Sequence, residues 1–175
     1  INQPEQVWVS DITYIGKREK PCYLSLITDA YSKKIVGYNV SDNLNTESSL
    51  AALRLAIKQR KNKELPLIHH SDRGLQYCAN EYQKMLNKNE IKPSITQNSY
   101  PYENAVAERI NGILKQEFYI DKYNKDLPIM KKIIKETVDI YNEKRPHLSN
   151  HMLTPNQMHL QNKLIMKTYK TKNSI

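Results

Sequence analysis

Three short runs of hydrophobic residues near the start of the chain predict β-strands. They cover residues 7–15, 21–28 and 35–40, and each is rich in β-branched and aromatic side chains. The connections between these runs are short, which favours antiparallel pairing of consecutive strands. We therefore expect the chain to open with a three-stranded antiparallel meander.

The first predicted strand carries a carboxylate in an otherwise uncharged row. Because alternate side chains share a face, we expect a common direction for Val7, Val9, Asp11, Thr13 and Ile15. A buried carboxylate is costly unless it is paired, hydrogen-bonded or bound to a metal ion. Asp11 is therefore either a strand residue satisfied by a backbone amide or a functional acid, and the strand pattern favours neither.

Helical periodicity begins after the meander and recurs along the rest of the chain. We expect a first helix to be capped by Asn45 or Thr46 and a second to be capped by Asn80, with Gln83 three residues on completing a capping-box pattern. Apolar residues at helical spacing predict a third helix over residues 102–118. A fourth helix is expected from Asp126 to Asn142 and a short fifth one over residues 155–164.

Two further strands, over residues 66–70 and 91–95, complete the order of elements. Pro93 indicates that the last of them lies at an edge of the sheet. Three strands, a helix, a strand, a helix, a strand and then helices give an α/β fold with a mixed five-stranded sheet flanked by helices, the ribonuclease-H-like plan. We expect one domain over residues 1–165 and a basic tail over 166–175.

Composition narrows the class of partner. Lysine and arginine number 27 against 18 acidic residues, a net charge of +9, which suits a protein that lies along a polyanion such as DNA. The four glycines form no phosphate-binding loop, so a nucleotide cofactor is not expected. The two cysteines, the lack of a long apolar run and the lack of a visible signal peptide predict a cytoplasmic, nucleoid-associated protein without membrane contact.

Two more acids stand where a site could form. Asp72 directly follows the predicted strand 66–70, at the kind of sheet edge where ligands bind in α/β folds, although an Asp-containing turn explains it equally simply. Glu108 lies on the polar face of the third helix with Asn111 and Lys115, which by default is an ordinary solvated face.

The local sequences around these acids resemble the catalytic core of insertion-sequence transposases related to retroviral integrases. The family signature is Asp, Asp, Glu with 35 residues between the last two acids, and 108 − 72 − 1 gives 35 here. The words WVSDITY around Asp11, HSDRGLQY around Asp72 and YENA before Glu108 match as well, as do YNEKRPH and LTP downstream. Glu103 and Arg109 depart from the family, which usually has Asp and a small residue there.

The resemblance implies metal-dependent DNA cleavage at transposon ends, followed by transfer of the 3′-hydroxyl into target DNA. Asp11, Asp72 and Glu108 would be the catalytic residues and would hold two Mg²⁺ or Mn²⁺ ions when DNA is bound, Asp11 bridging both. The chain would work as a homo-oligomer. Because it opens at Ile1, we expect a fragment, with the module that recognises the element ends lying upstream. A catalytically lost DNA-binding protein and a hydrolysis-only nuclease are the alternatives.

Four basic residues are candidate DNA contacts, each with a simpler explanation. Lys115, two helical turns after Glu108, could hold a phosphate or pair with Asn111. Arg109 could contact phosphate or face solvent. Arg145 and His147 could contact DNA or pin the preceding helix, and these two alternatives are equal.

Overall fold

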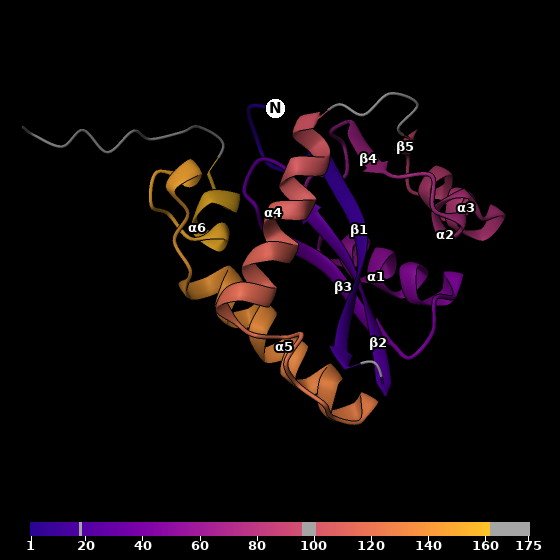
Figure 1. Ribbon diagram of the computed structural model, residues 1–175. Helices are drawn as coiled ribbons and strands as arrows, with labels where there is room; N and C mark the ends of the chain where they lie inside the picture. The colour runs from indigo at the N-terminus through magenta and orange to yellow at the C-terminus, as the bar shows by residue number, and fades with distance from the viewer. Residues whose placement is uncertain (18, 96–100, 162–175) are drawn as a thin grey trace, which may run out of the picture.

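Five strands form one mixed sheet in the order β3-β2-β1-β4-β5 (Figure 1). The computed structural model describes residues 1–17, 19–95 and 101–161. The strands are β1 (Val7–Lys17), β2 (Lys20–Asp29), β3 (Ile35–Ser41), β4 (Leu67–Ser71) and β5 (Ile91–Ile95). The first three pair antiparallel, which confirms the meander, and β4 lies parallel to β1. β5 is an edge strand, as Pro93 predicted.

Helices cover both faces of this sheet. They are α1 (Thr46–Gln59), α2 (Leu75–Cys78), α3 (Asn80–Lys88), α4 (Pro101–Glu117), α5 (Leu127–Lys144) and α6 (Pro155–His159), with a 3₁₀ turn, η1 (Leu148–Asn150). One hydrophobic core joins the sheet to α4 and α5, and a second joins it to α1, α2 and α3. Figure 1 shows α4 crossing in front of β1, with α6 beyond the upper end of α5. None of the helices in the described ranges is long and apolar enough to cross a membrane.

The alternation along β1 divides its side chains between the two cores. Val7, Val9 and Ile15 belong to the core under α4 and α5, whereas Trp8 belongs to the core under α1. Asp11 shares the odd-numbered face and is half-buried on the α4 side of the sheet. The predicted row of side chains is therefore confirmed. It directs Asp11 toward α4, which follows it in the sequence by nearly a hundred residues.

Several predicted helix ends differ from the structure. Residues 75–78 form α2, a helix that the sequence analysis missed, so the chain enters α3 with Ala79 as its cap and Asn80 makes no capping hydrogen bond. The fourth predicted helix extends to Lys144 rather than Asn142. The short last helix ends at His159, and the proposed tail, 166–175, lies outside the described residues.

Side-chain amides fasten the later helices to the turn between β2 and β3. Asn142 of α5 accepts a hydrogen bond from the backbone N–H of Ile35 (3.0 Å) and donates one to its carbonyl (2.9 Å). The Tyr141 hydroxyl donates to the carbonyl of Lys33 at 2.8 Å, and Asn150 donates to that of Ser32 at 2.7 Å. These bonds set the position of the turn relative to α5 and η1.

A buried polar network joins α6 to the opposite end of the chain. Asp29 accepts hydrogen bonds from the backbone of Glu5 and from Ser32, and the Glu5 carboxylate accepts two from the backbone after α1. Ser32 Oγ donates to Asp29 and therefore accepts from Nδ1 of His159, 2.9 Å away. The His159 ring lies 3.7 Å from Glu5 and 3.8 Å from Asp29, so two acids face one imidazole.

Candidate active site

Asp11 lies in the centre of the sheet, where a strand and a helix hold it from two sides. β1 is flanked by β2 and β4; at Asp11 its backbone pairs with Leu26 of β2, just beyond the last residue paired with β4. Asn111 of α4 donates a hydrogen bond from Nδ2 to Oδ2 of Asp11 at 2.5 Å. The carboxylate is thus fixed by a side chain of α4, and neither of the simple readings of the strand pattern anticipated this partner.

Asp72 follows β4 directly and is exposed. Its Oδ1 accepts a hydrogen bond from the backbone N–H of Gly74 at 2.8 Å, which is the Asp-containing turn considered above. A Cβ on Gly74 would lie 2.9 Å from that oxygen, so a larger residue there would displace the Asp72 side chain from its present position. Because β4 runs parallel to β1, the turn brings Asp72 to the same cavity as Asp11, a space of about 280 Å³ that Gln76 and Tyr77 also line.

The ionisation of Asp11 depends on its burial and on its neighbours in the cavity. Burial and, more weakly, the charge of Asp72 raise the pKa of Asp11. The backbone N–H of Ile12, the Asn111 amide and the charge of Lys115 oppose this rise. An acid whose ionised form is disfavoured by burial and by a second acid gains most from a cation placed between the two.

Glu108 does not share that cavity. It is exposed on α4 and lines a neighbouring space of about 370 Å³ together with Arg109 and Gly112. Its Cα is one helical turn from that of Asn111, the partner of Asp11. Within residues 1–17, 19–95 and 101–161, no three His, Cys, Asp or Glu side chains are grouped as a metal site would require. The structure thus brings together two of the three predicted acids.

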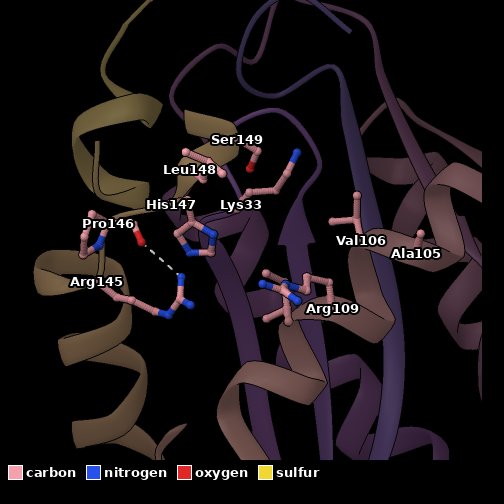
Figure 2. Close-up of a pocket in the computed structure, with 10 residues that line it drawn as sticks. Lys33, Ala105, Val106, Arg109, Arg145, Pro146, His147, Leu148 and Ser149 are labelled. Atoms are coloured by element: carbon pink, nitrogen blue, oxygen red, sulfur yellow. Dashed lines mark hydrogen bonds between the residues drawn. The ribbon is translucent and has the colours of Figure 1, made fainter. Parts of the chain in front are cut away.

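The four predicted DNA-binding residues divide between two places. Lys115 lies near enough to Asp11 to lower its pKa, and the described residues contain no hydrogen bond between Lys115 and Asn111. Arg109, Arg145 and His147 line a separate cavity of about 460 Å³, which Lys33 also lines (Figure 2). Arg145 also pins α5 to α4, because its Nε and Nη2 bind the Glu117 carboxylate at 2.7 and 2.6 Å.

The sequence analysis missed several residues that complete these sites. Tyr77 is buried below the Asp11–Asp72 cavity, and its hydroxyl has no hydrogen-bond partner among the described residues. Behind it, His69 Nε2 lies 2.6 Å from Ser10 Oγ and 2.9 Å from the Tyr82 hydroxyl. Burial lowers the pKa of His69 to about 3, so the imidazole is neutral and supports β4 by hydrogen bonding. The local signal available was the motif HSDRGLQY, which contains Tyr77, whereas nothing near His69 or Tyr82 in the sequence indicated that they meet.

Comparison with known proteins identifies the family of the chain. Two models described as "Integrase core domain" match residues 1–101 and 89–155. The chain is 37% identical over 148 residues to an uncharacterised 31 kDa protein of insertion element IS600 from Shigella sonnei, covering 82% of this chain and 53% of that protein. It is 31% identical over 160 residues to the transposase InsF of insertion sequence IS3fB from Escherichia coli K12, covering 91% and 55%.

The fold has close counterparts among solved structures. The catalytic core domain of HTLV-2 integrase, solved in complex with magnesium, superposes with a TM-score of 0.69 at 21% identity, covering 90% of this chain and 97% of that domain. The chain spans about half the length of the two insertion-element proteins named above. The matched family models agree with the sheet order and with the positions of Asp11 in β1 and Asp72 directly after β4. The chain therefore belongs to the integrase core domain family, among the insertion-sequence transposases.

Proposed function

We propose that this chain is the part of a DNA transposase that cuts phosphodiester bonds at the element ends and joins the freed 3′-hydroxyl to target DNA. The observation that carries the proposal is the shared cavity of Asp11 and Asp72, which come from parallel neighbouring strands in a core of this family. In this reaction the site must offset the negative charge of a phosphate and activate an attacking oxygen. Paired carboxylates that hold metal ions can meet both requirements.

The donor set of the cavity fits a hard divalent cation. Asp11 and Asp72 offer carboxylate oxygens, which Mg²⁺ and Mn²⁺ prefer, and Mg²⁺ is often held by one or two carboxylates together with substrate phosphate and water. When bound, a pair of such ions supplies an activated oxygen nucleophile and stabilises the leaving oxygen. The HTLV-2 integrase core was solved in complex with magnesium. For this chain we propose that two such ions bind once DNA is present.

Each residue of the site has a distinct task in this proposal. Asp11 would touch both ions and Asp72 would complete one site, held in position by the Gly74 turn. Glu108 would complete the other, which requires its carboxylate to leave the neighbouring cavity and approach Asp11. Asn111 keeps the Asp11 oxygens oriented, and Lys115 would bind a phosphate of the element end while its charge favours ionised Asp11.

The partners follow from the same reaction. Element ends and target DNA are the substrates. No nucleotide cofactor is needed, because each phosphodiester bond formed in strand transfer replaces one that is broken in the target. Two ends must be processed together, so we propose a homo-oligomer. Acting on chromosomal DNA would place the protein in the bacterial cytoplasm, at the nucleoid.

A strand-joining assay tests the proposal. The full-length transposase is incubated with labelled element-end DNA, a supercoiled target and Mg²⁺ or Mn²⁺. We expect joined products from the wild type, and from Asp72→Asn we expect retained DNA binding with joining reduced by at least about a thousandfold, since removing a catalytic group typically costs that much or more. Glu81→Gln, an exposed acid on α3, is the charge-matched control.

Each other outcome overturns part of this assignment. Cutting without joining would indicate a hydrolytic nuclease, and binding without cutting would indicate a protein whose catalysis is lost. Normal joining by Asp72→Asn would remove Asp72 from the site. Normal joining by Glu108→Gln would likewise exclude Glu108 as the third acid.

A further inference from the structure

We infer that the cavity lined by Lys33, Arg109, Arg145 and His147 binds a backbone phosphate of DNA, away from the catalytic acids (Figure 2). This inference rests on the proposed function for the identity of the polyanion. It adds a second contact region to the catalytic core and includes Lys33, for which no role was predicted from the sequence.

The cavity gathers cations from three separate parts of the chain. Lys33 comes from the β2–β3 turn, Arg109 from α4, and Arg145 with His147 from the end of α5. Figure 2 shows the two arginines reaching the cavity from different helices, with the His147 ring between those helices and the turn. The wall is completed by small and apolar residues: Ala105, Val106, Ile110, Pro146 and Leu148.

The arginines retain hydrogen-bonding capacity for a ligand. Arg145 uses one N–H each on Nε and Nη2 for Glu117 and one on Nη1 for the Pro146 carbonyl, so two of its five N–H groups stay uncommitted. Glu117 holds the guanidinium plane in place and offsets part of its charge. Arg109 is exposed and makes no hydrogen bond or ion pair within the described ranges, so its N–H groups are available to a ligand, although its charge also helps to lower the pKa of Glu117. The fork geometry of arginine matches phosphate oxygens.

Cations surround the His147 ring. Burial first, and then the charges of Arg145, Lys33 and Arg109, lower the pKa of this ring to about 4, against an opposing effect of Glu117. The ring stacks edge-on against Tyr141 and its buried Nε2 has no hydrogen-bond partner among the described residues. Grouping like charges is unfavourable in the absence of an anion, so a ligand with negative charge would relieve the repulsion.

The position of the cavity favours DNA over other anions. Arg109 and Ala105 line both this cavity and the neighbouring one that holds Glu108, so the two spaces adjoin along α4. A duplex whose phosphodiester lies at the acids would therefore extend over Arg109, and the chain's net charge of +9 provides the general attraction. An acidic segment of a second copy of this chain is the competing occupant, and the test separates the two.

The test compares two charge-matched double variants of the full-length protein. Lys33→Gln with Arg109→Gln removes two cavity cations without disturbing the Arg145–Glu117 pair. Lys131→Gln with Lys132→Gln removes two exposed cations of α5 that lie outside the cavity. Binding of a fluorescein-labelled duplex of mixed sequence is followed by anisotropy over a range of salt concentrations, and the oligomeric state by sedimentation.

We expect the cavity variant to bind the duplex roughly tenfold more weakly at low salt, and its slope of log K against log salt to fall by about two. The control pair should leave the slope near that of the wild type. An unchanged slope in the cavity variant would overturn the inference, as would equal losses in both variants. Dissociation of an oligomer with unchanged DNA binding would assign the cavity to a second copy instead.

The result is independent of catalysis. Should the strand-joining assay fail for the wild type while the cavity variant still loses its salt slope, the proposed reaction falls and the phosphate site stands. The converse result, joining by the wild type with an unchanged slope, removes only the phosphate site.

Discussion

Asn111 donates a hydrogen bond to Asp11 across 100 residues of sequence, and this bond couples helix α4 to the central strand. The contact joins the element that carries Glu108 to the one that carries the first acid. A movement of α4 that brings Glu108 closer to Asp11 would therefore also move Asn111, the hydrogen-bond partner of Asp11.

Replacing Asn111 with alanine should raise the pKa of Asp11 further, because the amide is one of the groups that hold it down. A hydrogen bond to a charged group contributes about 1.5–3 kcal/mol, so we expect strand joining to fall by at least tenfold. The acidic limb of its pH profile should shift to higher pH. The pH profile of strand joining is the measurement. Asn87→Ala, at an exposed position of α3, is the control, and a profile identical to wild type would contradict the assignment.

Lys115→Gln should change both the pKa of Asp11 and the affinity for DNA. Removing this cation takes away one influence that lowers the pKa of Asp11 and, in our proposal, one phosphate contact. The salt slope of DNA binding should therefore drop by about one, measured by anisotropy as above. Lys131→Gln provides the matched loss of charge, and a slope unchanged from wild type would exclude the phosphate contact of Lys115.

Two glycines should respond in opposite directions to alanine. A Cβ on Gly37 of β3 would lie 2.2 Å from the carbonyl oxygen of Ala52 in α1, so Gly37→Ala should destabilise the protein by about 1–3 kcal/mol or more. A Cβ on Gly112 of α4 meets nothing within 4 Å, and Gly112→Ala should stabilise it by roughly 0.5–1 kcal/mol. Urea unfolding measures both, and equal effects would show that strand and helix do not approach so closely.

The network around His159 predicts a pH-dependent stability. Burial lowers the pKa of His159, but the carboxylates of Asp29 and Glu5 outweigh it and the pKa is raised above 6.5. Its contribution to the free energy of unfolding is therefore fully present below pH 6.5 and is lost as the pH rises through the raised pKa. The stability difference between wild type and His159→Gln should shrink over that window when urea unfolding is repeated at successive pH values.

Glu5 supplies the opposite check within the same network. Burial raises its pKa, yet hydrogen bonds from His159 and from the backbone of Lys61 and Asn62 prevail and lower it from 4.5 to about 2. Its contribution is present above pH 4.5 and disappears as the pH falls toward 2. A stability difference for His159→Gln that grows with rising pH would contradict the ion-pair account of both residues.

The sequence predicted those features that depend on local periodicity. Alternation in β1 assigned Asp11 to the face with Val7 and Val9, and that face is the one under α4. The position of Asp72 after β4 predicted its meeting with Asp11, since parallel neighbouring strands bring equivalent ends together. Helical spacing placed Glu108 with Asn111, but spacing along a helix says nothing of how far each side chain lies from a sheet.

Features built from distant segments left no local signal. Lys33 enters the basic cavity because Asn142 and Tyr141 hold its turn, more than a hundred residues away in sequence. Ser32 and His159, 127 residues apart, meet in the same way. The capping role predicted for Asn80 was wrong because residues 75–78 wind into a helix of their own, which changes the direction from which the chain enters α3.

The double hydrogen bond between Asn142 and Ile35 has a consequence for how copies of this chain meet. Ile35 begins β3, which is the outermost strand on its side of the sheet. An exposed outer strand can recruit a strand from another molecule and start aggregation. The Asn142 carboxamide binds both the N–H and the C=O of Ile35, as an adjoining strand would. These two groups are therefore not available to a strand of another molecule, which disfavours intermolecular sheet growth at this end.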